Sequence, residues 1–211
     1  MTILVLDDEV QEDYRYLGPE IHRIAEESDY HVYAEKPEAF DLERYEGVII
    51  SGSTASVYEE EHEFIEPQRT LIRKCIERDV PLLGICFGHQ LVNDALGGVV
   101  KEDRRRSTFV EMTVTESDDP ILQGVEPVVP VLHADLVVKL GQGMKRTSTT
   151  DYNEYFCTRH KSAPVWTVQY HPEYTERVDD YPSDWSHGDR DFGECNATRT
   201  IDNFVTFCER R

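Results

Sequence analysis

A glycine-flanked cysteine directly after a short apolar run is the feature that most constrains how this chain can fold. Residues 81–90 read PLLGICFGHQ, which places Cys86 between an apolar segment and an amphipathic one. This pattern predicts a strand, a sharp turn and a helix, the nucleophile-elbow arrangement with sulfur in place of a serine hydroxyl. Side chains at Gly84 and Gly88 would collide with neighbouring backbone in so tight a turn. We therefore expect Cys86 at a sheet edge beside a helix N-terminus, where the helix dipole favours the nucleophilic thiolate.

A histidine and a glutamate in a later segment supply the other groups that a nucleophilic cysteine needs. Residues 168–173 read VQYHPE. Pro172 keeps the backbone extended, so the side chains of His171 and Glu173 can lie on one face. A carboxylate beside an imidazole fixes the tautomer of the ring and raises its basicity. We therefore predict Cys86 as nucleophile, His171 as base and Glu173 as the carboxylate that orients it.

Apolar runs alternate with helical patterns along the chain, which is typical of an α/β protein. The 211 residues fit one domain spanning residues 1–211. Residues 176–195 lack periodicity and are predicted to form either an ordered surface loop near the site or a mobile lid. We expect strands at residues 2–6, 30–34 and 47–51, helices at residues 18–28 and 64–76, and a strand-rich part at residues 99–169 before a closing helix.

The charge of the chain disfavours polyanionic partners. Asp and Glu number 42 against 22 Lys and Arg, which gives a formal net charge of −20 spread along the whole chain. Nucleic acid and anionic membranes would be repelled by such a surface. The dispersed acidity resembles that of proteins from salt-accumulating halophiles, and an ordinary acidic cytosolic protein is the alternative.

Cysteine usage and hydropathy predict a cytoplasmic protein. The five cysteines are an odd number without framework spacing, so we expect reduced thiols. No segment approaches the roughly 20 apolar residues of a membrane span, and the N-terminus lacks the basic region of a signal peptide. The histidines and cysteines show no paired ligand spacing, so we predict neither a metal site nor a cofactor.

Three further groups of polar residues have two interpretations each. His89, in the first turn of the elbow helix, could line a pocket or cap a neighbouring group. His133, in the segment LHADLV, could approach the site or lie in a plain turn. The Asp7-Asp8-Glu9 run resembles the acidic pocket of a phosphate-accepting receiver domain. That interpretation requires an aspartate near position 50, where the sequence has Ile50 and Ser51, so we reject it.

Taken in order, these motifs resemble the class I (triad-type) glutamine amidotransferases. The likeness extends over roughly residues 45–173 and the closing helix. It rests on residues 81–90, on His133-Ala134-Asp135 followed by a Leu-Gly-Gln-Gly turn, and on residues 165–173. The nearest likeness is to stand-alone domains similar to the glutaminase part of GMP synthase, and to the related γ-glutamyl peptidases.

The resemblance implies a three-layer α/β sandwich around a mixed, mainly parallel sheet. It implies that Cys86 attacks the side-chain amide of glutamine, and that His171, oriented by Glu173, acts as base and then as acid. Ammonia would leave, and water would hydrolyse the γ-glutamyl thioester. The oxyanion would be bound by the backbone N–H groups of Phe87 and Ser53. The substrate-binding residues would be Gln90, Gly52, His133 and Asp135.

The chain departs from the family pattern at two places. The second oxyanion loop is usually Gly-Gly-Pro, whereas this chain has Gly52-Ser53-Thr54. A non-glycine residue there can hold a different backbone angle or need a partner to flip it into place. The usual Glu-x-Gly strand after Gly98 is replaced by a segment containing Arg104-Arg105-Arg106. These arginines could bind a substrate carboxylate, or could form a charged hairpin tip paired with surface acids.

Four functions remain open on the sequence. The first is a glutaminase that passes ammonia to a separate synthetase, since no nucleotide-binding motif follows within this chain. The second is a hydrolase of other γ-glutamyl amides. The third is a catalytically silent binding or regulatory domain. The fourth is the intracellular peptidase and chaperone-like group, whose members typically have histidine directly after the cysteine, where this chain has Phe87.

Overall fold

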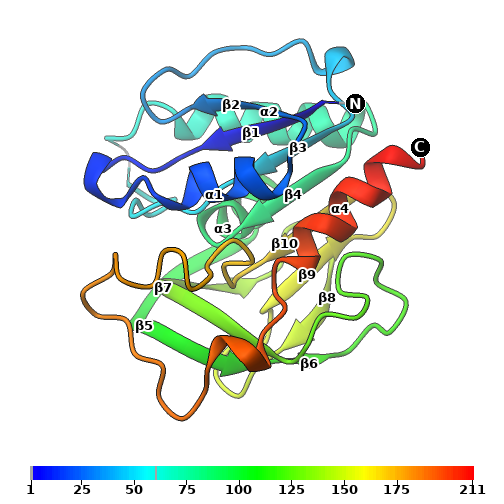
Figure 1. Cartoon of the computed structure of the whole chain (residues 1–211). Coiled ribbons are helices and arrows are strands. Elements are labelled where there is room, and N and C mark those ends of the chain that lie inside the picture. The colour runs from blue at the N-terminus through cyan, green and yellow to red at the C-terminus, as the bar shows by residue number, and fades with distance from the viewer. Residues whose placement is uncertain (1, 60) are drawn as a thin grey trace.

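A mixed eight-stranded sheet forms the middle layer of the computed structural model, which describes residues 2–59 and 61–211 (Figure 1). The strand order is β2-β1-β3-β4-β10-β9-β8-β6. The first five strands of this order are parallel, and β9, β8 and β6 continue the sheet antiparallel. The strands are β1 (Ile3–Asp7), β2 (Ser28–Val32), β3 (Gly47–Ile50), β4 (Leu82–Ile85), β6 (Thr113–Val114), β8 (Met144–Thr149), β9 (Cys157–His160) and β10 (Val165–Val168).

Helices cover both faces of the parallel half of the sheet. Figure 1 shows α1 (Leu17–Ile24) and α4 (Arg199–Glu209) in front of the sheet, with α2 (Ile65–Glu77) and α3 (Phe87–Ala95) behind it. Short 3-10 turns occupy Glu12–Tyr14, Leu42–Arg44 and Phe192–Glu194. The three layers, with a mostly parallel central sheet, confirm the predicted fold class.

Alternate residues of each strand belong to two separate hydrophobic cores, because successive side chains of a strand point to opposite faces. In β1, Ile3 and Val5 pack with α1 and α4, whereas Leu4 and Leu6 pack with α2 and α3. Strands β1, β3 and β4 are buried throughout and have continuous apolar sequences, as buried parallel strands do. This burial explains why these three strands were recognisable from sequence.

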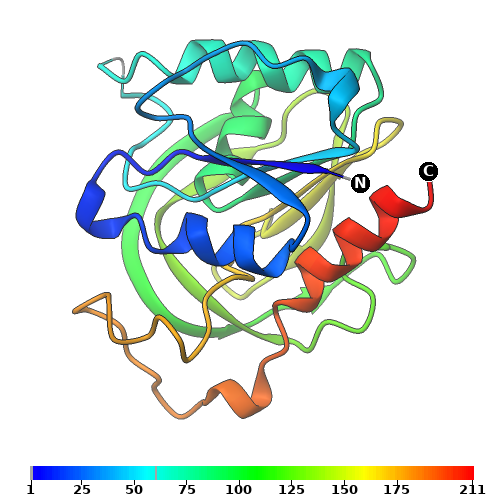
Figure 2. The ribbon, with the colours of Figure 1, turned by 45° about the horizontal axis from the view of Figure 1, so that its top comes forward.

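Two strands of the part predicted to be strand-rich form a long antiparallel ribbon outside the main sheet, a separation that the sequence did not predict. The ribbon pairs β5 (Val99–Glu111) with β7 (Val128–Lys139), and Figure 2 shows it curving below the sheet. The pairing is irregular between Glu102 and Arg106. The three arginines at residues 104–106 therefore lie at a bulge within β5 rather than at a hairpin tip.

Two predicted element boundaries are wrong, and strand pairing is the reason. The helix predicted at residues 18–28 ends at Ile24, and Glu26 adopts a positive φ of 45°. Ser28 then pairs with Ile3, so β2 begins before the predicted 30–34 strand. The chain thus leaves the predicted helix after Ile24 and enters the edge strand β2 at Ser28. Within the described residues no helix is long and apolar enough to cross a membrane.

Candidate active site

Cys86 lies at a strained turn between β4 and α3. Its backbone has φ 51° and ψ −101°, a conformation that non-glycine residues adopt only when their surroundings enforce it. The Cys86 N–H donates to the Val168 carbonyl at 2.8 Å, which ties the turn to β10. A Cβ on Gly84 would lie 2.5 Å from the Gly88 carbonyl oxygen, and one on Gly88 2.6 Å from that of Ile50. The predicted need for both glycines is therefore confirmed.

His171 and Glu173 follow β10, the parallel neighbour of β4. Since the carboxyl ends of parallel strands meet at one edge of the sheet, this connection brings His171 to the elbow. The His171 Nδ1 is 2.8 Å from Glu173 Oε1, and both residues are buried. The carboxylate holds the proton on Nδ1, so Nε2 is free to exchange a proton. Within the described residues Nε2 makes no hydrogen bond.

Gly52 shows how close the cysteine and the histidine lie. A Cβ on Gly52 would be 2.7 Å from His171 Cε1 and 3.5 Å from Cys86 Cβ. Burial by itself lowers the pKa of His171, but the negative charges of Cys86 and Glu173 outweigh it and raise the pKa to about 10. The His171 ring between Cys86 and Glu173 therefore favours its protonated form. The Gln169 amide and the Leu132 carbonyl each lie 3.7 Å from the Cys86 sulfur.

The loop after β3 runs beside the elbow. The Gly88 N–H donates to the Ser51 carbonyl at 3.1 Å, which joins the loop to α3. Ser53 lines the same pocket as Cys86, and its Oγ accepts from the Ala55 N–H at 3.0 Å. Phe87 begins α3, so its backbone N–H belongs to the first turn of a helix, where amides lack intrahelical acceptors.

The far wall of the pocket is a network around Asp135. The Asp135 carboxylate accepts from Ser56 Oγ at 2.6 Å and from the Tyr58 hydroxyl at 3.0 Å, and its carbonyl accepts from Gln90 Nε2 at 3.1 Å. His133 lies 3.2 Å from the same carbonyl through Nδ1. Burial lowers the pKa of His133 to about 3, so the ring is neutral and acts here as a hydrogen-bonding group.

One pocket of about 180 Å³ brings most of the predicted site residues together. Glu173 lies behind His171, and Phe87 follows Cys86 in the turn. His89 does not line this pocket. It is fully buried and bonds Thr167 Oγ1 at 2.7 Å, which makes it a core residue. The predicted residues that line the pocket are Cys86, His171, Gly52, Ser53, Gln90, His133 and Asp135.

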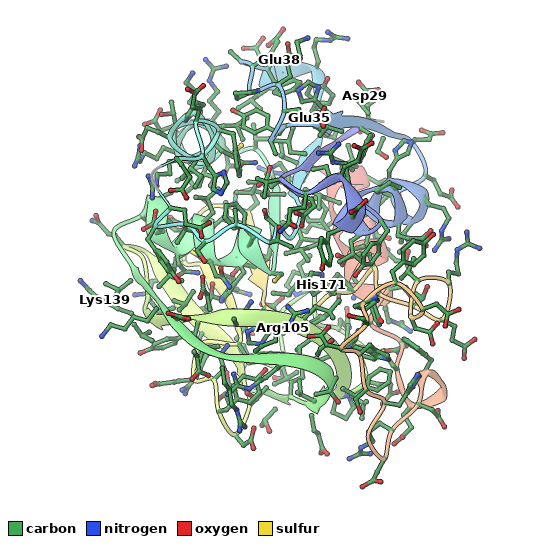
Figure 3. The ribbon with its side chains drawn as sticks, turned by 90° about the vertical axis from the view of Figure 1, so that its left-hand side faces the viewer. Asp29, Glu35, Glu38, Arg105, Lys139 and His171 are labelled. Atoms are coloured by element: carbon green, nitrogen blue, oxygen red, sulfur yellow. The ribbon has the colours of Figure 1, made fainter. Side chains whose placement is uncertain are left out.

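Sequence reasoning missed one group of pocket residues, the N-terminal segment that includes Asp7, Glu9 and Tyr16. Its acidic run follows β1 at the edge where the elbow lies, and this position directly after a strand was the available signal. Arg105 belongs to the three arginines that were predicted either to bind a substrate carboxylate or to pair with surface acids. It lines the pocket, where Figure 3 labels it below His171, and its guanidinium pairs with Asp184 at 2.9 Å. In the described part of the chain, no cluster of three or more metal-ligating side chains is present.

Asp184 belongs to the segment 176–195, which is packed against β5. The Ser186 N–H donates to the Ser107 carbonyl at 3.0 Å. Trp185 and Phe192 pack on Phe109 with ring centroids 5.1 and 5.0 Å apart. This segment is thus an ordered loop beside the site, one of the two predicted alternatives.

The sequence is similar to those of known glutamine amidotransferases. The model of the family described as glutamine amidotransferase class-I matches residues 19–182. The GMP synthase [glutamine-hydrolyzing] of Wolinella succinogenes is 32% identical over 147 residues, which are 67% of this chain and 27% of that protein. The enzyme of Thermosipho africanus is 32% identical over 130 residues, 61% of this chain and 24% of that protein. The matched region thus spans about a quarter of the length of these relatives.

Solved structures share the fold. A protein from Thermoplasma acidophilum, described as a GMP synthase subunit, has a TM-score of 0.72 at 19% identity, covering 100% of this chain and 94% of its own. A glutamine amidotransferase from Thermotoga maritima has a TM-score of 0.73 at 21% identity, covering 86% of this chain and 80% of its own. With the family match over most of its length, this chain belongs to the class I glutamine amidotransferase family.

Proposed function

We propose that the chain is a single glutamine amidotransferase domain over residues 1–211. It hydrolyses the side-chain amide of glutamine through a γ-glutamyl thioester and delivers the ammonia to a separate synthetase. The observation that carries this proposal is the buried His171–Glu173 pair, with its 2.8 Å bond, beside Cys86 on a strained elbow. This arrangement has the three roles of a nucleophilic triad.

In the first step, the Cys86 thiolate attacks the amide carbon of glutamine. A carbon–sulfur bond forms, and the carbonyl electron pair moves onto the oxygen. The backbone N–H groups of Phe87 and Ser53 stabilise this oxyanion, because preformed donors in a buried site need no reorganisation. The closeness of this loop to the reacting groups supports the proposal, since a Cβ on Gly52 would lie 2.7 Å from His171 Cε1 and 3.5 Å from Cys86 Cβ.

In the second step, His171 gives its Nε2 proton to the amide nitrogen. The carbon–nitrogen bond breaks, ammonia leaves and the thioester remains. Neutral His171 then takes a proton from water, the hydroxide attacks the thioester, and glutamate leaves as the thiolate is restored. Glu173 keeps the other ring proton on Nδ1 throughout, which preserves the reactive tautomer.

The substrate end of the pocket supports an amino-acid ligand. The Asp135 carboxylate, held by Ser56 and Tyr58, provides a negative group for an α-ammonium. Gln90 and His133 supply neutral hydrogen-bonding groups next to it. The relatives named GMP synthase support a synthetase as the acceptor of the ammonia, supplied by a partner.

A second candidate is a hydrolase of other γ-glutamyl amides. Arg105 is the observation in its favour, because this guanidinium lines the pocket and could meet a carboxylate on a larger leaving group. A catalytically silent binding domain is the candidate from another class. The intact triad geometry argues against it.

The experiment measures ammonia and glutamate release from L-glutamine in molar KCl. Cys86→Ala should abolish release while the far-ultraviolet circular dichroism stays unchanged. Cys195→Ala is the matched control, since this thiol lies outside the pocket, and it should keep full activity. Release by Cys86→Ala would refute the nucleophile. Wild-type protein that releases no ammonia from glutamine, but releases glutamate and the corresponding amine from other γ-glutamyl amides, would establish the second candidate.

A further inference from the structure

Glu9 contacts the oxyanion loop although it has no role in the proposed chemistry. It follows β1 and is almost fully buried. Its Oε2 accepts from the Thr54 N–H at 2.8 Å, and its Oε1 accepts from the Thr54 hydroxyl at 2.5 Å. Oε1 also accepts from the Gln11 N–H at 2.8 Å. The carboxylate therefore joins the end of β1 to the loop after β3.

The end of β1 also helps to fix the peptide unit that precedes Ser53. The Ser51 hydroxyl donates to the Gly52 carbonyl at 2.7 Å and accepts from the Asp8 N–H at 2.9 Å. The Gly52 carbonyl and the Ser53 N–H belong to one planar trans peptide unit, so they point in opposite directions. The Ser53 N–H is thus directed away from the Ser51 hydroxyl.

Both peptide units that flank Ser53 are held by these contacts. Ser51 fixes the unit before it, and Glu9 fixes the unit after it through the Thr54 N–H. With both planes fixed, the φ and ψ of Ser53 are determined. The usual family loop, Gly-Gly-Pro, has proline where this chain has Thr54, and proline has no N–H to donate. The Glu9–Thr54 contact is therefore specific to a loop of this composition.

We propose that Glu9 is a positioning residue, which orients the Ser53 amide for the oxyanion by holding Thr54. This inference rests on the proposed function, because it concerns the same site. The loop then needs no partner protein to flip it into place.

Glutamine at position 9 tests the idea without changing the size of the side chain. Each carboxylate oxygen of Glu9 accepts a backbone N–H, one from Gln11 and one from Thr54. An amide offers a single oxygen, so in either orientation its NH₂ group faces one of these donors. The Glu9 side chain is almost fully buried and these contacts are partly buried, so water only partly offsets the lost hydrogen bond.

The expected effect of Glu9→Gln is a fall in kcat of about 10-fold to 100-fold, below the roughly 10²–10³-fold loss on removing an oxyanion donor. The KM for glutamine should change less than about twofold, since an oxyanion donor acts in the transition state. Glu12→Gln is the matched control, because this exposed residue lies in the same segment, and its kcat should equal that of the wild type. Thr54→Val, which keeps the N–H and loses the hydroxyl, should show a smaller loss.

Combining Glu9→Gln with a loop variant distinguishes a positioning role from a general effect on stability. The loop variant Ser53→Gly/Thr54→Pro lacks both Thr54 donors and keeps only the Gln11 N–H as a donor to Glu9, so adding Glu9→Gln to it should cause no further loss of kcat. A purely structural role would instead lower the unfolding temperature by the same amount in both backgrounds. Amide hydrogen exchange provides the direct readout, and exchange at Thr54 should accelerate in Glu9→Gln while amides of β1 and β3 stay protected.

Each outcome is decisive. An active wild type with an equally active Glu9→Gln variant overturns the inference and leaves the proposed function standing. An additive loss in the loop variant also overturns it. A wild type that releases no ammonia overturns the proposed function and the catalytic part of the inference together, whereas hydrogen exchange at Thr54 still decides whether Glu9 holds the loop.

Discussion

Alanine at position 52 would place one methyl group against the two reactive residues. The added Cβ would lie 2.7 Å from His171 Cε1, whereas carbon atoms in contact normally lie about 3.5–4.0 Å apart. The imidazole must therefore move by about 1 Å, because Cys86 is held in place by the turn between β4 and α3. A 1 Å displacement of a reacting group can reduce the rate about 100-fold, or about 2.7 kcal/mol.

The fold should tolerate Gly52→Ala. Gly52 does not have a positive φ, so alanine fits its backbone conformation. Alanine reduces the entropy of the unfolded chain, which contributes about 0.4–1 kcal/mol of stability and offsets part of the crowding. We therefore expect kcat for ammonia release from glutamine to fall about 100-fold, with a change of less than about 2 kcal/mol in the free energy of unfolding by urea.

Gly47→Ala is the matched control at the other end of the same strand. Its Cβ would meet Cys208 Sγ at 2.7 Å and Phe204 Cζ at 3.1 Å, an overlap of the same size in the core. This variant should lose about 1–3 kcal/mol of stability and keep the wild-type kcat. A Gly52→Ala enzyme with kcat within twofold of the wild type would refute the argument that this glycine makes room for His171.

Two further predictions concern charge. Burial opposes the charged form of His171, but Cys86 and Glu173 raise its pKa from 6.5 to about 10, so its contribution to stability is complete below pH 6.5 and is lost as the pH rises to about 10. The unfolding free energy should thus fall more steeply from pH 7 to pH 10 in the wild type than in His171→Gln. Cys86→Ala should lower the midpoint of the His171 titration measured by NMR. An unchanged midpoint would contradict the interaction between Cys86 and His171. The net charge of −20 predicts that the unfolding temperature rises as KCl is increased from about 0.1 M to about 2 M, and a flat response would argue against a halophilic surface.

Local backbone geometry allowed the elbow and the pairing of His171 with Glu173 to be predicted from the sequence. The turn at Cys86 requires glycines at fixed spacing, and His171 and Glu173 are separated by one proline in an extended segment. Continuous apolar runs likewise identified the buried strands β1, β3 and β4. These features depend on residues near one another in the chain, so a single sequence contains the necessary information.

Only the tertiary structure decided which distant segments share the pocket. Glu9 and Thr54 are 45 positions apart, and they meet because β1 and β3 are parallel neighbours whose carboxyl ends lie at the same edge of the sheet. Arg105 reaches the pocket because a bulge interrupts the β5–β7 pairing, and β2 shortens α1 because Ser28 pairs with Ile3. The sequence by itself determined the α/β class and indicated the groups proposed to react, since their geometry is local. The wall around those groups and the support of the oxyanion loop came from strand order, which no local pattern encodes.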